Sequence, residues 1–368
     1  MARAPKRILV VGAGLSGLAA ARTLADRGHE VVVLDKGRAP GGRASTRREP
    51  GERSFDHGAQ FFTARGDWLT SRLKAWEAEG VVGRWTPRVA TSLSPAAAAS
   101  SLEGPRDGET WWVGTPGMGS LAAHLARGLD VRTASAVTSL VRQRDTWLVA
   151  GSSAAGARGD PAEAFEHVAD ALVLAVPAPQ CGALLGDALA TSELGRHAAA
   201  AVLEPCWAAM IALSIDIDGA SSVDLMTSKS APLAWAAREA SKPGRFVTAG
   251  EDLWTLHASP EWSRAHLEDE PKDVASLLAG ALLDRLAEVE RREGRDGPRA
   301  RVTHASAHRW RFARAATSPH RGCLYDDALA LALCGDWLES ARIEGAFTSG
   351  VAAAARLLEA EGNTATNR

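Results

Sequence analysis

The chain has 368 residues, of which 46% are apolar and 23% charged, and its formal net charge is −2. This composition is ordinary for a globular enzyme of one large or two medium domains, and it gives no general attraction to nucleic acid or to an anionic membrane. The four cysteines are scattered and none lies in a C-x-x-C pair, so neither a disulfide framework nor any metal site is predicted. Glycines break the apolar run behind the basic N-terminus, and no run of about twenty apolar residues occurs, so we expect no signal peptide, no membrane span and a cytoplasmic location.

The first motif predicts a nucleotide-binding unit. Residues 7–11 read as a buried strand, residues 12–17 are a G-x-G-x-x-G loop, and a helix at 18–27 leads to a second strand that ends at Asp35. Glycines at 12, 14 and 17 permit the tight turn, the approach of a pyrophosphate and close helix packing. The helix N-terminus offers free N–H groups to phosphate, and Asp35 would bind a ribose diol. The residues predicted to bind the ADP part of a dinucleotide are Gly12, Ala13, Gly14, Leu15, Ser16, Gly17 and Asp35.

This motif alone leaves FAD and NAD open as alternatives. Lys36 follows Asp35, and Gly41-Gly42-Arg43 stands a few residues later. Two glycines and an arginine at this place resemble the fingerprint of the FAD-dependent amine oxidase and protoporphyrinogen oxidase superfamily. The resemblance implies a loop around the pyrophosphate and an arginine along the cofactor, with a solvated arginine as the alternative. We therefore predict FAD, bound non-covalently, because no Cys or His precedes the 342–346 turn where a covalent link would form.

Later segments predict that the fold is discontinuous. Residues 171–176 are a continuous apolar run typical of a central strand, and residues 131–140 read as the strand before it, with the backbone near Val137 meeting the adenine in the flavin family. Strand-like segments and a long amphipathic helix at 271–290 follow. We predict an α/β protein with a Rossmann-type FAD-binding domain and an α+β substrate domain on a mixed or antiparallel sheet. The FAD-binding domain comprises residues 1–60, 105–185 and 320–368, and the substrate domain comprises residues 61–104 and 186–319.

A second strand–turn–helix pattern lies near the C-terminus. A strand at 329–334 ends in Gly335-Asp336, and a helix runs from about residue 347 to 360. Asp336 would contact a ribityl hydroxyl or the pyrophosphate, or it is simply a turn residue. A helix start at Gly345 and Ala346 would direct N–H groups to the flavin edge that becomes anionic on reduction. The predicted cofactor contacts in this region are Gly335, Asp336, Ile343, Glu344, Gly345 and Ala346.

Motifs along nearly the whole chain resemble the bacterial renalase group. They are GGRASTRR, FDHGAQFFTAR, TPGMGSL, SKPGR, LHASPEWSRAHL, HRWRFAR and CGDWL followed by RIEGAFTSG. The resemblance implies oxidation of NAD(P) isomers reduced at ring position 2 or 6. Hydride transfer to flavin N5 gives NAD(P)+, and O2 is then reduced to hydrogen peroxide.

Such a reaction needs little acid–base catalysis, because oxidation makes a dihydropyridine aromatic. The protein has to hold that ring about 3 to 3.5 Å from the flavin. His257 and Trp310 match pocket-lining positions of the resembling enzymes, and Gln60, with Gly58 and Ala59, is expected beside the flavin ring. The alternatives are a structural histidine and a core tryptophan.

Other basic residues have weaker predicted roles. Arg65, Arg309, Arg311 and Arg314 are candidates for the substrate phosphates, although strand alternation puts only some of the last three on one side. Lys242 has the residue type of the lysine that holds a water near flavin N5 in many amine oxidases, but Pro243-Gly244 favours a simple turn.

Three rival functions remain open. A flavin amine oxidase with two clamping tyrosines is impossible, because Tyr325 is the only tyrosine, although some of the tryptophans would serve instead. A desaturase acting on a large apolar substrate lacks a candidate membrane-facing segment. A non-catalytic flavin-binding protein would not explain the motifs of the substrate domain. The sequence makes no prediction of oligomeric state.

Overall fold

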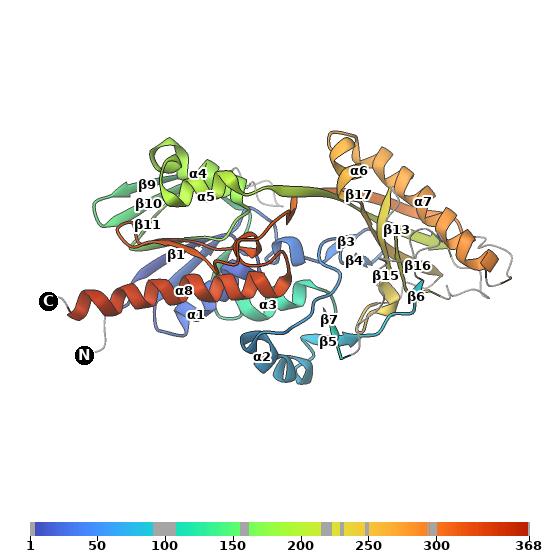
Figure 1. The fold of residues 1–368 in the computed structure, drawn as a ribbon, viewed down its shortest axis with the longest axis horizontal. Coiled ribbons are helices and arrows are strands. Elements are labelled where there is room, and N and C mark those ends of the chain that lie inside the picture. Colours follow the sequence, from blue (N-terminus) through green and yellow to red (C-terminus); the bar gives the residue numbers. More distant parts are fainter. Residues whose placement is uncertain are drawn as a thin grey trace.

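The computed structural model describes residues 4–90, 108–154, 162–214, 223–228, 232–246, 250–292, 294 and 300–366. Figure 1 shows two lobes side by side, one around helices α1 and α8 and the other around helix α7, with the long strands β13 and β17 reaching from one lobe to the other. The N-terminal, middle and C-terminal parts of the chain meet in the first lobe.

The first lobe is built on a six-stranded sheet in the order β18-β19-β12-β1-β2-β8. All neighbours are parallel except β18 and β19. The central strands are apolar throughout because helices cover both faces. The strands are β1 (Arg7–Val11), β2 (Glu30–Leu34), β8 (Asp130–Arg132), β12 (Ala171–Leu174), β18 (Leu324–Asp326) and β19 (Leu331–Leu333).

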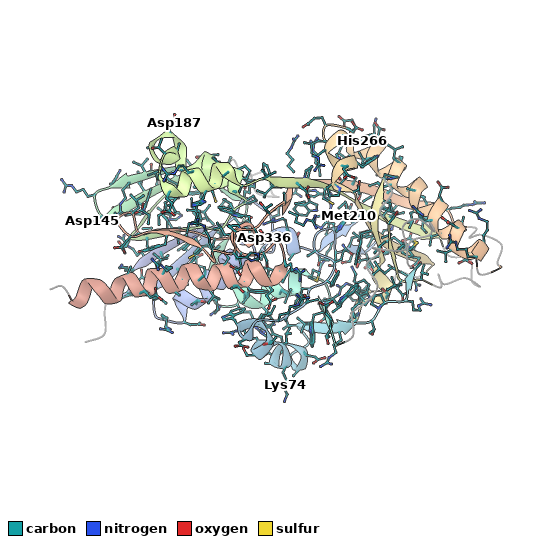
Figure 2. All side chains as sticks on the ribbon, in the orientation of Figure 1. Lys74, Asp145, Asp187, Met210, His266 and Asp336 are labelled. Atoms are coloured by element: carbon teal, nitrogen blue, oxygen red, sulfur yellow. The ribbon has the colours of Figure 1, made fainter. Side chains whose placement is uncertain are left out.

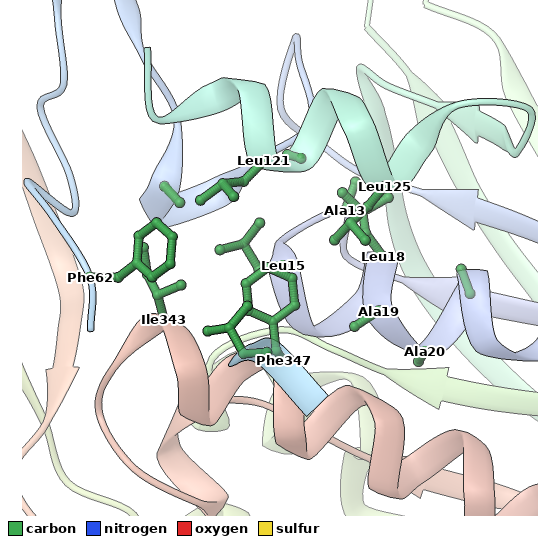
Figure 3. Packing of buried hydrophobic residues seen from close by; sticks show 14 of the residues in the cluster. Ala13, Leu15, Leu18, Ala19, Ala20, Phe62, Leu121, Leu125, Ile343 and Phe347 are labelled. Carbon is green, nitrogen blue, oxygen red and sulfur yellow. The ribbon is translucent and has the colours of Figure 1, made fainter. Parts of the chain in front are cut away.

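Alternate residues of β1 show how this sheet is buried on both faces. Ile8 and Val10 pack with helices α1, α3 and α8, whereas Leu9 and Val11 pack with helices α4 and α5. Figure 3 shows part of the first of these clusters, where Leu15 lies between Leu121 and Phe347 and Leu18 lies beside Leu125. The helices are α1 (Leu15–Ala25), α3 (Gly119–Ala126), α4 (Ala178–Ala190), α5 (Glu193–Ala200) and α8 (Ile343–Thr366). Helix α8 is therefore longer at both ends than the predicted 347–360.

The strand predicted at 131–140 is wrong, since two strands in different sheets occupy it. Strand β8 ends at Arg132, Ala134 has a positive φ of 53°, and β9 begins at Ser135. This turn redirects the chain out of the large sheet into a three-stranded antiparallel sheet. That sheet consists of β9 (Ser135–Gln143), β10 (Thr146–Ser153) and β11 (Ala164–Ala169).

The second lobe carries the predicted mixed sheet, in the order β17-β13-β16-β15-β14-β6. Its pairs are antiparallel except β14 with β6. The strands are β6 (Val89–Ala90), β13 (Leu203–Ser214), β14 (Leu225–Thr227), β15 (Leu233–Arg238), β16 (Glu251–Ala258) and β17 (Val302–Ala315), and helices α6 (Pro260–Ala265) and α7 (Pro271–Arg292) complete the lobe.

The two faces of this sheet have different partners. Trp207, Ala209 and Ile211 of β13 pack with residues of α7. The intervening Met210 and Ala212 pack with Phe55 from the first part of the chain. Because side chains alternate along a strand, the face that carries Ala208, Met210 and Ala212 looks toward the nucleotide-binding lobe.

The remaining described elements join the lobes. They are η1 (Gly42–Ala44), β3 (Arg47–Glu49), β4 (Arg53–Phe55), α2 (Asp67–Ala78), β5 (Val82–Trp85), β7 (Trp111–Gly114), η3 (Glu239–Ser241) and η4 (Asp336–Leu338). Helix α5 packs in the core of the first lobe, so we propose the end of α5 as the boundary in place of residue 185. Strand β7, from the predicted FAD-binding part, pairs with β5, from the predicted substrate part. The boundary proposed at residues 104 and 105 lies outside the described residues. No described helix has the length and apolarity needed to cross a membrane.

We expect Gly350→Ala to separate helices α1 and α8. A Cβ atom at this position would lie 2.0 Å from the carbonyl oxygen of Ser16, which is backbone and has to shift. Overpacking of this kind costs about 1–3 kcal/mol, measurable by urea unfolding. Gly280→Ala in helix α7 is the control, because no atom lies within 4 Å of its Cβ position, and it should add roughly 0.5–1 kcal/mol. Equal effects of the two substitutions would contradict this packing.

Candidate active site

A large cleft lies between the two lobes. Its volume is about 2620 Å³, and it is lined by the G-x-G-x-x-G loop, the 58–60 turn, strands β16 and β17, and the start of helix α8. Single small-molecule sites usually measure about 300–1,000 Å³, so this cleft has room for a large cofactor and a second ligand. Figure 2 shows Asp336, which lines the cleft, near the middle of the molecule.

The nucleotide end of the cleft has the shape of a phosphate cradle. A Cβ atom on Gly17 would lie 1.9 Å from the Gly12 carbonyl oxygen, and Gly12 has a φ of 109°. Both positions therefore require glycine. Gly14 caps helix α1 without a side-chain bond, and within the described chain the amides of Ser16 and Gly17 have no hydrogen-bond acceptor. A bound phosphate would satisfy these amides.

Asp35 closes this end of the cleft from the second strand. Its carboxylate accepts the amide of Ala13 at 2.6 Å and the amide of Gly37 at 2.6 Å. These bonds fix the carboxylate at the cleft wall, where its remaining lone pairs are available to a ribose diol. The residues present thus fit the ADP part of FAD.

Arg43 and Asp336 bind each other. Arg43 donates to the two carboxylate oxygens of Asp336 at 3.1 and 2.6 Å and to the Ala313 carbonyl at 3.1 Å. Both residues line the cleft. The guanidinium therefore ties the Gly41–Gly42 loop to the C-terminal turn and to strand β17. A bidentate pair of this kind is geometrically specific, so these three segments hold one wall of the cleft together.

Helix α8 begins at Ile343, two residues before the predicted helix start at Gly345 and four before the predicted range of about 347–360. The Ala346 amide already donates to the Arg342 carbonyl at 3.1 Å. At this end of the helix, and within the described chain, the amides of residues 343–345 have no hydrogen-bond acceptor. Glu344 turns away from the cleft, because its carboxylate accepts the amides of Arg65 and Gly66 at 2.7 and 2.6 Å.

The cleft brings together most of the residues predicted from the sequence. Ala13, Gly17, Glu344 and Gly345 do not line it, and Gly17 and Gly345 instead allow close backbone packing. The predicted residues that line the cleft are Gly12, Gly14, Leu15, Ser16, Asp35, Lys36, Gly41, Gly42, Arg43, Gly58, Ala59, Gln60, Val137, His257, Trp310, Gly335, Asp336, Ile343 and Ala346.

One side of the cleft is a wall of rings that consists of His57, His257, His308 and Trp310. Ala208 of β13 lies opposite His308 on one side and opposite His257 on the other. Opposed residues of a sheet point to the same face, so the small Ala208 leaves room between the two imidazoles. The His57 ring lies 5.1 Å from His308 and 4.9 Å from Trp310. We name these four residues the ring wall.

The imidazoles of the ring wall are held neutral. Burial, then the neighbouring His308, Arg47 and His257, lower the pKa of His57 to about 3. Burial lowers the pKa of His257 to about 4, against the opposing effect of its bond to the His57 carbonyl. Burial and Arg47 also lower the pKa of His308. At neutral pH this wall therefore presents uncharged rings.

Behind the 58–60 turn lies a buried ion network of Asp56, Glu239, Lys242 and Arg245. Lys242 Nζ is 3.0 Å from Glu239 Oε2 and 3.5 Å from Asp56 Oδ2, and all three side chains are almost fully buried. Arg245 pairs with Asp56 and lies 3.6 Å from Glu239. Burial alone would raise the pKa of Asp56, but Lys242 and Arg245 hold it below its ordinary value. The negative charges of the two carboxylates are thus balanced by the positive charges of Lys242 and Arg245.

Lys242 reaches the cleft only through Gln60. The expected turn is present at Pro243 and Gly244, but the lysine side chain is buried and does not line the cleft. Its Nζ donates to Gln60 Oε1 at 3.0 Å, and Gln60 Nε2 donates to the Asp56 carbonyl. These bonds fix the orientation of the Gln60 amide, with its oxygen toward Lys242 and its nitrogen toward the Asp56 carbonyl.

The arginines proposed for substrate phosphates have acidic partners. Arg309 and Arg311 both bind Glu268, on the face of β17 opposite Trp310. Arg314 pairs with Glu204 at 3.4 Å and Arg65 with Glu109 at 2.8 Å. The predicted alternation along β17 therefore separates Arg309 and Arg311 from the ring wall.

We expect Lys242→Met to destabilise the protein by roughly 3–5 kcal/mol, because it leaves an uncompensated buried carboxylate. The double substitution Lys242→Met with Glu239→Gln restores the charge balance and should recover part of the loss. Urea unfolding of the protein without added cofactor measures both. Arg311→Met breaks an exposed pair with Glu268 and is the control, with an expected effect much smaller than that of Lys242→Met. A Lys242→Met effect as small as the control would show that the network is not a stabilising unit.

Stability should fall as pH falls between about 6.5 and 4. His57 and His257 have folded pKa values of about 3 and about 4, below the ordinary 6.5, so in this window the unfolded chain binds protons that the folded chain does not. Each group contributes about 1.4 kcal/mol per pH unit. His57→Phe should reduce the change in the free energy of unfolding per pH unit by roughly one such increment. Above pH 7, the plot of unfolding free energy against pH should run parallel to that of wild type. An unchanged slope would show that His57 is protonated in the fold.

Comparisons with known proteins agree with this geometry. Residues 10–75 match the model of the NAD(P)-binding Rossmann-like domain. An L-amino acid oxidase of Cerastes cerastes is 54% identical over 48 residues, which are 13% of this chain and 9% of that relative. One of Daboia russelii is 57% identical over 44 residues, which are 12% of this chain and 9% of that relative. The matched segment thus spans about a tenth of these curated relatives.

Solved structures match over the whole length. A putrescine oxidase bound to putrescine has a TM-score of 0.65 at 14% identity and covers 97% of this chain and 99% of its own. Cyclohexylamine oxidase from Brevibacterium oxydans IH-35A has a TM-score of 0.66 at 15% identity with the same coverage. The predicted fold class is confirmed. The chain thus combines a match to the NAD(P)-binding Rossmann-like domain with an overall fold similar to those of putrescine oxidase and cyclohexylamine oxidase.

Proposed function

We propose that this protein is an FAD-dependent oxidase of the renalase type. Its substrates are NAD(P) isomers reduced at ring position 2 or 6, and O2 is the electron acceptor. The balanced reaction converts dihydro-NAD(P), O2 and one proton to NAD(P)+ and hydrogen peroxide. The ring wall carries this proposal, because its uncharged rings suit a planar, uncharged hydride donor.

The acids that line the cleft support this choice of substrate. Of the five acids that line the cleft, Asp336 is bound by Arg43, Asp35 by two backbone amides, and Glu204 by Arg264 and Arg314. The other two are Glu79, which lies near His124 and Arg127, and Glu52. Within the described chain, no cleft-lining carboxylate hydrogen-bonds to the ring wall. A cationic substrate at the ring wall would therefore meet uncharged rings, whereas a dihydropyridine needs only packing and orientation.

FAD, when bound, accepts the hydride and passes its electrons to O2. The chain's part in the reaction is to bind and to orient. The glycine cradle and the open amides of helix α1 would hold the pyrophosphate. Ile343 and Ala346 line the cleft at the start of α8, where the free amides of this helix would bind the flavin edge. The ring wall and Gln60 enclose the substrate ring and exclude water. The size of the cleft supports a substrate as large as a dinucleotide.

A flavin amine oxidase is the second candidate. The likeness to putrescine oxidase and cyclohexylamine oxidase favours it at the level of the fold. A clamp of two tyrosines is excluded by the sequence, and Tyr325 itself does not line the cleft. Tryptophans 235 and 310 do line it and would take that place. A non-catalytic flavin-binding protein is the third candidate.

An anaerobic substrate panel separates these functions. We expect 2- or 6-dihydroNAD(P) to bleach the bound flavin within seconds and to yield NAD(P)+, and admission of O2 should then give one hydrogen peroxide per substrate. Ordinary 4-dihydroNAD(P) is the matched control for nonspecific hydride transfer. Bleaching by a primary amine but by neither isomer would establish the amine oxidase. Failure of every donor, with dithionite still able to bleach the flavin, would favour the binding protein.

A further inference from the structure

Two ring-wall side chains converge on a single backbone atom, the carbonyl oxygen of His57. Trp310 Nε1 donates to it at 2.9 Å, and His257 Nε2 lies 3.3 Å from it. A carbonyl oxygen only accepts, so His257 donates from Nε2, which is the protonated nitrogen of this neutral imidazole. The donors stand on strands β17 and β16, with β13 between them. The substrate-domain sheet thus holds one peptide of the nucleotide-binding lobe from two sides.

The other end of the same peptide faces the cleft. The Gly58 amide has no hydrogen-bond acceptor within the described chain, and Gly58 lines the cleft. The next amide, that of Ala59, donates to the Arg43 carbonyl at 2.8 Å. A Cβ atom on Gly58 would lie 2.0 Å from that carbonyl oxygen, so only glycine lets the turn pass so close to the Arg43 backbone.

Hydrogen bonds to the carbonyl oxygen of a peptide group affect the N–H group of the same peptide. In a poorly solvated site, two donors on the carbonyl oxygen polarise the peptide and make its N–H a stronger donor. They also prevent the peptide from rotating. The Gly58 N–H is therefore both aimed and strengthened by side chains that lie on other strands.

We propose that Trp310 and His257 are positioning residues that act on the cofactor through the His57–Gly58 peptide. Their two bonds to the His57 carbonyl fix and polarise this peptide, so that the Gly58 N–H donates to the ring of the bound cofactor. This inference rests on the proposed FAD site and is independent of which substrate reduces it. It gives Trp310 a role that depends on its N–H group, separate from the packing of its ring.

Trp310→Phe tests this role, because it keeps an aromatic ring against His57 and His308 and removes only the donor. Trp235→Phe is the matched control, since Trp235 also lines the cleft but its Nε1 has no hydrogen-bond partner. FAD affinity is measured by titrating the apoprotein, and the two-electron reduction potential by equilibration with a reference dye. We expect Trp310→Phe to weaken binding of reduced FAD roughly tenfold more than that of oxidised FAD, which is a potential about 30 mV lower. Trp235→Phe should change neither.

His257 provides a second test in case Trp310→Phe does not fold. His257→Gln keeps an N–H donor and should retain the potential within a few millivolts' error of wild type, whereas His257→Leu should lower it as Trp310→Phe does. The double variant Trp310→Phe with His257→Leu should fall further than either single variant, by an amount different from their sum, because the two donors share one acceptor.

The possible failures are distinct. A potential that is the same in Trp310→Phe, Trp235→Phe and wild type would overturn the positioning role while leaving the proposed oxidase intact. Equal effects of His257→Gln and His257→Leu would also overturn it, since they would mark a steric effect. Wild-type protein that does not bind FAD would overturn both this inference and the proposed function.

Discussion

The buried network of Asp56, Glu239, Lys242 and Arg245 is the constraint on which the cleft depends. Asp56 comes from the nucleotide-binding part of the chain and the other three from the substrate domain, so the two lobes meet at a set of charges that water does not reach. Removing such charges from water costs several kcal/mol per ion, and only mutual pairing with full hydrogen bonding offsets that cost. Asp56 also accepts the Met118 amide and the Thr46 hydroxyl, and Glu239 accepts the Asp56 amide and the Thr255 hydroxyl. The network therefore tolerates few relative positions of the lobes.

The network is bonded directly to the cleft wall. Lys242 fixes the amide of Gln60, and the adjoining turn carries Gly58 and the His57 carbonyl that receives Trp310 and His257. On the opposite wall, Arg43 and Asp336 connect the pyrophosphate loop with the C-terminal turn. The charges of Asp56, Lys242 and Asp336 are thus satisfied by other protein groups. Around the 58–60 turn the cleft wall offers neutral rings and a backbone amide, which suits a reaction that depends on placement more than on proton transfer.

The sequence predicts the parts of this arrangement that are local. The strand, glycine loop, helix and acid between Arg7 and Asp35 form one short unit whose pattern dictates its shape, and the alternating positions of β17 correctly divide Arg309 and Arg311 from Trp310. The sequence does not predict the network, because Asp56 and Glu239 are 183 residues apart and nothing local indicates that they meet. His57 lay within the FDHGAQ motif, yet its membership of the ring wall depends on the register of β13, β16 and β17. The split of residues 131–140 depends on a single positive φ at Ala134, a residue type that gives no warning of it.

The same fold serves amine oxidases, so the fold alone does not decide the substrate. We propose that the choice of substrate depends on the side chains that line the cleft from the sheet of the second lobe. In this chain one row across that sheet carries His308, Ala208, His257 and Trp235 in register. Ala208, the smallest residue of the row, lies between the two imidazoles of His257 and His308. The side chains of His257 and Trp310 bind the carbonyl of His57. Because burial keeps these imidazoles uncharged, the row offers ring faces and edges in place of a counter-ion. A donor that becomes a cation only on oxidation would be held as a neutral ring and released once charged, and this asymmetry favours a dihydronicotinamide over an amine.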